Sequence, residues 1–207
     1  MKKLLILLFS LFFLNSPTVF AEDISDFQIE GMSIGDSLLD YMTEEEILKE
    51  IERNKGRYSY LKEPDKYAHI SLWKDFPTYD GIQFFIKNNS TNQYITDKNE
   101  KYTILYIRGL IDFTEDFDSC MQKRDEIVEV LSSMFSNVKK SEIFGEHPSD
   151  PSGDSIMDAV YFDLEESTKV QVVCTNYEET FRIKNKKGEG FSLIIRPEEI
   201  RNWLLDK

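Results

Sequence analysis

The sequence contains few residues of the kinds that bind metal ions. Its 207 residues include two cysteines and two histidines, and His69 and His147 lie far apart along the chain. A zinc site needs three or four clustered nitrogen, sulfur or carboxylate ligands. Asp150, Asp154 and Asp158 recur at every fourth position, which is not the spacing of a calcium-binding loop. We therefore expect no metal site and no cofactor.

Positive charge is also scarce. The chain has 25 lysine and arginine residues against 38 aspartate and glutamate residues, a formal net charge of -13. A surface of this sign repels the phosphate backbone of nucleic acids and anionic lipid headgroups. The short basic run of Arg182, Lys184, Lys186 and Lys187 is interpreted as part of a solvated hairpin. We expect no nucleic-acid partner. The expected ligand or partner is an unidentified small molecule or protein.

Long apolar runs are absent except at the N-terminus. Residues 4–14 form an apolar block behind two lysines, and Val19 and Ala21 stand at the positions of a signal-peptidase site. The block would cover only about half of a hydrocarbon core that is ~30 Å thick, so it is too short for a membrane anchor. The pattern predicts a signal peptide over residues 1–21, cleaved after Ala21. We expect a soluble mature chain without a membrane anchor, located in the periplasm or secreted.

The two cysteines, Cys120 and Cys174, both follow the predicted cleavage site. In an oxidising compartment, an even number of cysteines indicates a disulfide. Cys120 shares a helical face with apolar residues, and Cys174 continues the apolar alternation of Val170 and Val172. We predict a Cys120–Cys174 disulfide, and two buried free thiols are the alternative.

Residues 22–207 are expected to form one acidic domain, because they contain no repeat and no linker and are numerous enough for one core. Short turns between strands favour antiparallel pairing, with helices segregated from the strands. The predicted fold class is α+β: a mainly antiparallel sheet with one long central helix, N-terminal helices and a short C-terminal helix.

Two capping patterns mark the predicted N-terminal helices. Thr43 is followed three residues later by Glu46, which is the spacing of a capping box, and Gly56 can end that helix in a left-handed conformation. Ser33 and Asp36 form a similar pair, which predicts a short helix that begins near Ser33.

Apolar periodicity predicts the remaining elements. The helical spacing over 116–135 indicates the longest helix, and Pro197 indicates the first turn of a C-terminal helix. Residues 145–155 are rich in proline, glycine and serine and predict a loop, while 186–190 predicts a hairpin turn. Alternating apolar residues predict strands at 68–72, 82–86, 103–107, 156–164, 168–175 and 191–196.

Residues 35–38 read Gly-Asp-Ser-Leu. This tetrapeptide resembles the first block of the GDSL family of serine esterases and lipases, and the resemblance implies that Ser37 is a nucleophile. His147 is the nearest match to the family's later D-x-x-H block, but Phe144 stands in the aspartate position and the chain has no G-x-N-D block. A nucleophilic serine needs an oriented base and oxyanion donors. The resemblance is therefore limited to the tetrapeptide.

The wider segment IGDSLLDYMTEEEI, residues 34–47, resembles the opening of certain uncharacterised exported bacterial proteins. That resemblance implies export and no particular activity. It also places the tetrapeptide in a pattern that differs from that of the esterases.

The first predicted strands carry aromatic side chains on their outward face. If their apolar residues point to the core, then Tyr67, His69, Trp73, Tyr106 and Arg108 point away from it. Exposed aromatic residues beside an arginine are typical of binding surfaces. The alternative is that the C-terminal helix packs on this face and buries them.

These patterns together indicate an exported, soluble, non-catalytic binding or envelope-accessory module. The alternative function is a GDSL-type ester hydrolase that uses Ser37 with His147.

Overall fold

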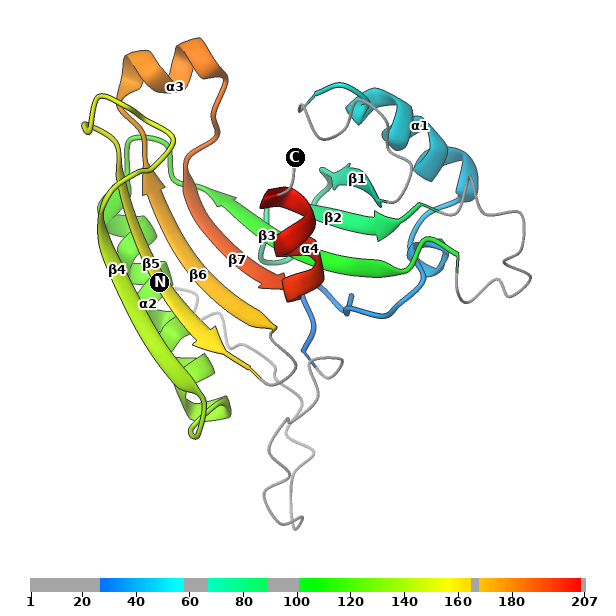
Figure 1. The fold of residues 1–207 in the computed structure, drawn as a ribbon, viewed down its shortest axis with the longest axis horizontal. Helices are drawn as coiled ribbons and strands as arrows, with labels where there is room; N and C mark the ends of the chain where they lie inside the picture. Colours follow the sequence, from blue (N-terminus) through cyan, green and yellow to red (C-terminus); the bar gives the residue numbers. More distant parts are fainter. Residues whose placement is uncertain (1–26, 58–66, 89–100, 165–167, 206–207) are drawn as a thin grey trace, which may run out of the picture.

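The structure, a computed structural model, describes residues 27–57, 67–88, 101–164 and 168–205 (Figure 1). The predicted signal peptide, its cleavage site and the short segment between the strands predicted at 156–164 and 168–175 lie outside these residues.

A seven-stranded antiparallel sheet forms the centre of the fold, with the strand order β1-β2-β3-β7-β6-β5-β4. The predicted α+β class and antiparallel sheet are confirmed. The strands are β1 (Tyr67–Leu72), β2 (Gly81–Lys87), β3 (Ile104–Asp112), β4 (Lys139–Glu146), β5 (Ile156–Asp163), β6 (Lys169–Asn176) and β7 (Gly190–Arg196). The α-helices are α1 (Glu44–Asn54), α2 (Phe117–Met134), α3 (Glu179–Asn185) and α4 (Glu198–Leu205).

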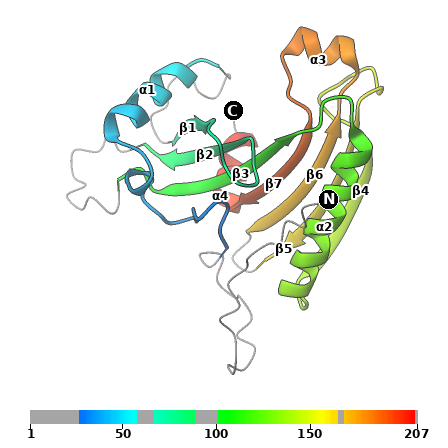
Figure 2. The ribbon, with the colours of Figure 1, turned by 180° about the vertical axis from the view of Figure 1, so that it is seen from behind.

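Helices α2 and α4 lie on opposite sides of the curved sheet (Figures 1 and 2). We call these sides the α2 face and the α4 face. Alternate residues of each strand point to the two faces. The α2 face holds the main apolar core, with Ile70, Phe84, Ile107, Val172 and Leu193 all buried.

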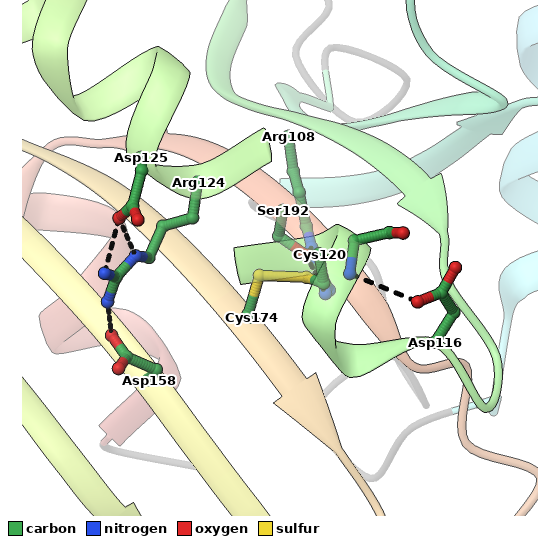
Figure 3. Close-up of a disulfide and its surroundings, with 9 residues drawn as sticks. Arg108, Asp116, Cys120, Arg124, Asp125, Asp158, Cys174 and Ser192 are labelled. Carbon is green, nitrogen blue, oxygen red and sulfur yellow. Dashed lines mark hydrogen bonds and ion pairs between the residues drawn. A yellow bond between two sulfur atoms is a disulfide. The ribbon is translucent and has the colours of Figure 1, made fainter. Parts of the chain in front are cut away.

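A disulfide joins α2 to the sheet. The Cys120–Cys174 bond predicted from the sequence is present, with the two Cα atoms 5.9 Å apart. One turn further along α2, Arg124 pairs with Asp125 of the same helix and with Asp158 of β5 (Figure 3). The helix is thus attached to two neighbouring strands, once covalently and once by an ion pair.

The capping box of α1 is present as predicted. The Thr43 hydroxyl accepts a hydrogen bond from the Glu46 N–H at 3.3 Å, and the Glu46 carboxylate accepts one from the Thr43 N–H at 2.8 Å. The helix ends before Gly56, which has a φ of 74°.

The short helix predicted at Ser33 begins later than expected. The first helical turn among the described residues is the 3-10 helix Leu38–Asp40, and Ser37 is its N-cap residue. The Asp36 carboxylate does accept a hydrogen bond from the Ser33 N–H, at 2.8 Å. No helix begins at that pair: Gly35, which lies between the two residues, has a φ of 96° and its N–H bonds to β3.

Two further segments differ from the sequence prediction. The basic run Arg182–Lys187 does not form a hairpin turn: its first residues lie in α3, which connects β6 to β7, and the Glu178 carboxylate caps that helix by accepting from two backbone N–H groups. Strand β4 was not predicted, and its end at Glu146 falls in the expected loop. Its sequence shows no alternation of apolar and polar residues, because nearly all of its residues are exposed.

Candidate functional site

Helix α4 covers part of the face on which aromatic residues were expected to be exposed. Tyr67 and Tyr106 are buried. The Trp203 ring of α4 meets the Tyr67 ring edge-on, with centroids 5.0 Å apart, and the Tyr67 hydroxyl donates a hydrogen bond to Glu199. For these two tyrosines the alternative interpretation holds: the C-terminal helix packs on them and buries them.

His69 is also buried, with its ring 5.3 Å from that of Phe85. Burial lowers the pKa of His69 to about 4, and the positive charges of Arg57, Arg108 and Arg53 add to this effect. His69 is therefore neutral at neutral pH.

Trp73 and Arg108, the other two predicted residues, line a cleft of about 350 Å³ on this face. We call it the Arg108 cleft. The Trp73 side chain is 55% exposed. Its indole ring occupies the space over Gly81, where an added Cβ would lie 2.4 Å from the ring. The cleft is walled by parts of β2, β3 and β7, by Arg57 and Trp73 on one side, and by Tyr177 and 186–189 on the other.

Arg108 lies on the floor of the cleft. Its Nε and Nη2 atoms donate hydrogen bonds to the Ser192 hydroxyl at 3.1 and 2.7 Å (Figure 3). Ser192 is buried on β7, the strand beside β3. A guanidinium has five N–H donors. No carboxylate among the described residues pairs with Arg108.

The carboxylates near this guanidinium bind other groups. Asp80 accepts from the Asp112 N–H at 2.7 Å, and Asp112 accepts from the Thr114 N–H at 2.8 Å. Glu189 accepts from the Glu115 N–H at 2.9 Å. These three carboxylates stabilise the turns around the cleft, and none of them forms an ion pair with Arg108.

Two lysines add positive charge at the rim. Lys186 and Lys187 follow α3, and neither makes an ion pair within the described part of the chain. The sequence prediction treated them as solvated turn residues and did not single out Ser192. Ser192 could have been found as the polar residue that alternates with Phe191 and Leu193. No sequence pattern indicated that the two lysines belong to the cleft, because only the fold brings residue 187 near residue 108.

The tetrapeptide 35–38 is part of the structural framework. The Ser37 side chain is mostly buried, at 7% exposed; its hydroxyl donates to the Lys101 carbonyl at 2.8 Å and accepts from the Leu39 N–H at 3.3 Å. The Gly35 N–H donates to the carbonyl of Ile104 at 2.8 Å. The segment thereby extends the sheet beside the start of β3.

His147 belongs to a different hydrogen-bond network. Its Nδ1 lies 2.8 Å from the Ser149 hydroxyl, and its Nε2 lies 3.1 Å from the Tyr177 hydroxyl. Burial lowers the pKa of His147 and the charge of Lys187 lowers it further, while Asp150 opposes the shift. Among the described residues, no hydrogen bond joins His147 to Ser37.

Two of the three aspartates considered for a calcium loop have other partners. Asp150 accepts from the hydroxyls of Ser152 and Ser155, and Asp158 pairs with Arg124. Within the ranges that the structure describes, no group of histidine, cysteine and carboxylate side chains is placed to hold a metal ion. No helix in those ranges is long and apolar enough to cross a membrane.

Comparison with family models, curated proteins and solved structures finds no significant match to this chain. The activity must therefore be inferred from the chemistry of the Arg108 cleft and its surroundings.

Proposed function

We propose that this chain is an exported, soluble, non-catalytic binding protein that holds a small anionic molecule in the Arg108 cleft. The observation that carries the proposal is the half-buried guanidinium of Arg108, whose acceptor among the described residues is a neutral hydroxyl, that of Ser192. A cation in this position retains donors for a ligand. It lies in a protein whose formal charge is -13, where carboxylate partners would be easy to supply.

The arrangement suits a carboxylate, phosphate or sulfate group. The planar fork of an arginine matches two oxygens of such a group, and lysines add point charges at longer range. Trp73 offers an apolar surface for the rest of the ligand. The volume of about 350 Å³ is at the lower end of small-molecule sites.

The lack of catalysis is supported by the contacts of Ser37 and His147. The Ser37 hydroxyl proton is directed at the Lys101 carbonyl, which is a much weaker base than a histidine nitrogen at neutral pH. The two ring nitrogens of His147 face hydroxyls of Ser149 and Tyr177. An ester hydrolase would need the serine and the histidine in contact.

Intrinsic fluorescence can test the binding proposal, because the chain has two tryptophans and Trp73 lines the cleft. In a Trp203→Phe background, titration with citrate and with inorganic phosphate should give a saturable change in Trp73 emission, and glucose should give none. Arg108→Gln should weaken the binding about 10- to 100-fold, the effect of losing hydrogen bonds from a charged group.

Arg201→Gln is the matched control, because Arg201 is exposed on α4 and lies outside the cleft. It should leave the affinity unchanged. Binding that Arg108→Gln does not weaken, or the absence of binding by either anion, would refute the proposed site. Labelling by a fluorophosphonate probe that disappears in Ser37→Ala would favour the hydrolase instead.

A further inference from the structure

Strand β4 differs from the other edge of the sheet. At the opposite edge, β1 is almost wholly buried and packs against α1. All residues of β4 except Gly145 are exposed, and β4 is the last strand in the sheet order. Its middle residues are apolar, with Ile143 52% and Phe144 69% exposed. Natural proteins usually protect such an edge by a proline, a bulge or a central lysine, because it can pair with another strand. Ile143 and Phe144 provide none of these.

The hydrogen-bond phase of β4 follows from its pairing with β5. The His147 N–H donates to the Ser155 carbonyl at 2.7 Å, in register with the pairs of β4 and β5. In an antiparallel ladder, alternate residues bond to the same neighbour. Odd-numbered residues of β4 therefore bond to β5. The backbone groups of Lys140, Glu142, Phe144 and Glu146 point outward.

Outward groups at even positions restrict how a second β4 could pair with the first. Even residues must face even residues in an antiparallel pair. One register places Lys140 opposite Glu146 of the second copy, and Glu146 opposite its Lys140. In this register Ile143 lies opposite Ile143 on the α4 face, and the two Phe144 rings are diagonal neighbours on the α2 face, within the reach of aromatic side chains.

The neighbouring registers are worse. A shift by two residues in one direction places Glu142 opposite Glu142, and a shift in the other direction places Glu142 opposite Glu146 twice. Like charges directly opposite each other destabilise a pair of strands. In the Lys140–Glu146 register, oppositely charged residues face each other over the longest overlap of the two strands. This register also brings Ile143 and Phe144 into contact with their counterparts in the second copy.

We propose that the protein forms a two-fold symmetric dimer in which β4 pairs antiparallel with β4 of a second copy, joining two seven-stranded sheets into one. The inference is independent of the Arg108 cleft, which no residue of β4 lines. The complementary charges and the self-facing Ile143 favour a second copy as the occupant of this edge over a peptide from another protein.

Sedimentation equilibrium of the exported protein can test the charge pairs. The unmodified chain should be dimeric at about 100 µM, and Lys140→Glu and Glu146→Lys should each raise the dimer Kd about tenfold, since each creates two like-charged pairs. An equimolar mixture of the two variants should recover the original affinity. In the mixed dimer, the acidic pair on one strand faces the basic pair on the other.

Lys49→Glu and Glu129→Lys are the matched controls, because they make the same charge changes at exposed positions of α1 and α2. They should leave the dimer Kd unchanged. Ile143→Cys should form a crosslinked dimer on mild oxidation, because facing Cα atoms in a non-hydrogen-bonded pair lie about 4.5 Å apart, whereas Ser141→Cys should not crosslink. Three results would overturn the proposal. They are a monomeric unmodified chain, a dimer Kd that neither charge variant raises, and a mixture of the variants whose Kd is no lower than that of either variant alone.

Discussion

The two faces of the sheet bury different kinds of side chain. On the α2 face, apolar residues continue across all the central strands, and a disulfide and an ion pair hold the covering helix. On the α4 face, the apolar cluster around Phe85 and Ile200 is small, and beside it lies the cleft with Arg108. The contrast separates the two roles of the sheet. One face buries most of the apolar core, and the other holds the polar groups of the proposed binding cleft.

Neighbouring phenylalanines of β2 give the sharpest test of this comparison. Phe84 points into the α2 face and Phe85 into the α4 face, and both are buried. We expect Phe84→Ala to lower the free energy of unfolding by about 4 kcal/mol. Phe85→Ala should cost about 2 kcal/mol, because the short helix that covers it can shift into the space. Denaturation by urea would measure both, and equal costs would contradict the difference between the faces.

Removal of the disulfide should weaken the α2 face nearly as much. The bond spans 54 residues. In the chain-entropy model, a loop of this length contributes roughly 4 kcal/mol. The double variant Cys120→Ala/Cys174→Ala should lower the melting temperature markedly in calorimetry. Reducing agent should affect the unmodified protein and leave the variant unchanged, which provides the control.

Acid should weaken the α4 face through His69. The pKa of His69 is about 4 in the folded chain, against 6.5 for an unperturbed histidine. Between pH 4 and 6.5 the unfolded chain therefore binds more protons than the folded chain. Stability from this residue is complete above pH 6.5 and is lost as the pH falls toward 4. The loss should reach about 3 kcal/mol. His69→Gln should flatten the stability profile in this window, and an unchanged profile would argue against the shifted pKa.

Ser37→Ala should have the smallest of these effects. The hydroxyl donates to Lys101 and caps the turn at Leu39, so we expect a loss of about 1 kcal/mol. Anion binding in the Arg108 cleft should not change, because Ser37 does not line it. A variant of normal stability that loses binding would show that Ser37 belongs to the functional face after all.

Much of the fold follows from local patterns, because burial imposes them. Thr43 and Glu46 cap α1 as their spacing predicts, and the alternation in β1 and β2 places Ile70 and Phe84 in the core of the α2 face. In β3 the predicted alternation is interrupted, because a register irregularity beside Ile104 leaves Leu105 packed with the cluster of the α4 face. Strand β4 could not be predicted in this way, since a strand exposed on both sides has no alternation to detect.

The candidate site was only partly predictable for a different reason. Strand alternation singled out Trp73 and Arg108 as outward-facing residues, and both line the cleft. The covering of Tyr67 and Tyr106 depends on where α4 packs, and Lys187 joins the cleft only through the path of the chain after α3. Such long-range packing leaves no periodic trace in the sequence.

The strand order also has a consequence for folding. Strands β1 to β3 are neighbours in sequence and in space, and so are β4 to β6, whereas β7 alone joins the two groups. Pairs such as Ile107 with Ile195 can form only after nearly the whole chain has been synthesised. Contacts of such high sequence separation slow folding. The sheet can therefore close only once β7, which follows the other six strands in the sequence, has been made.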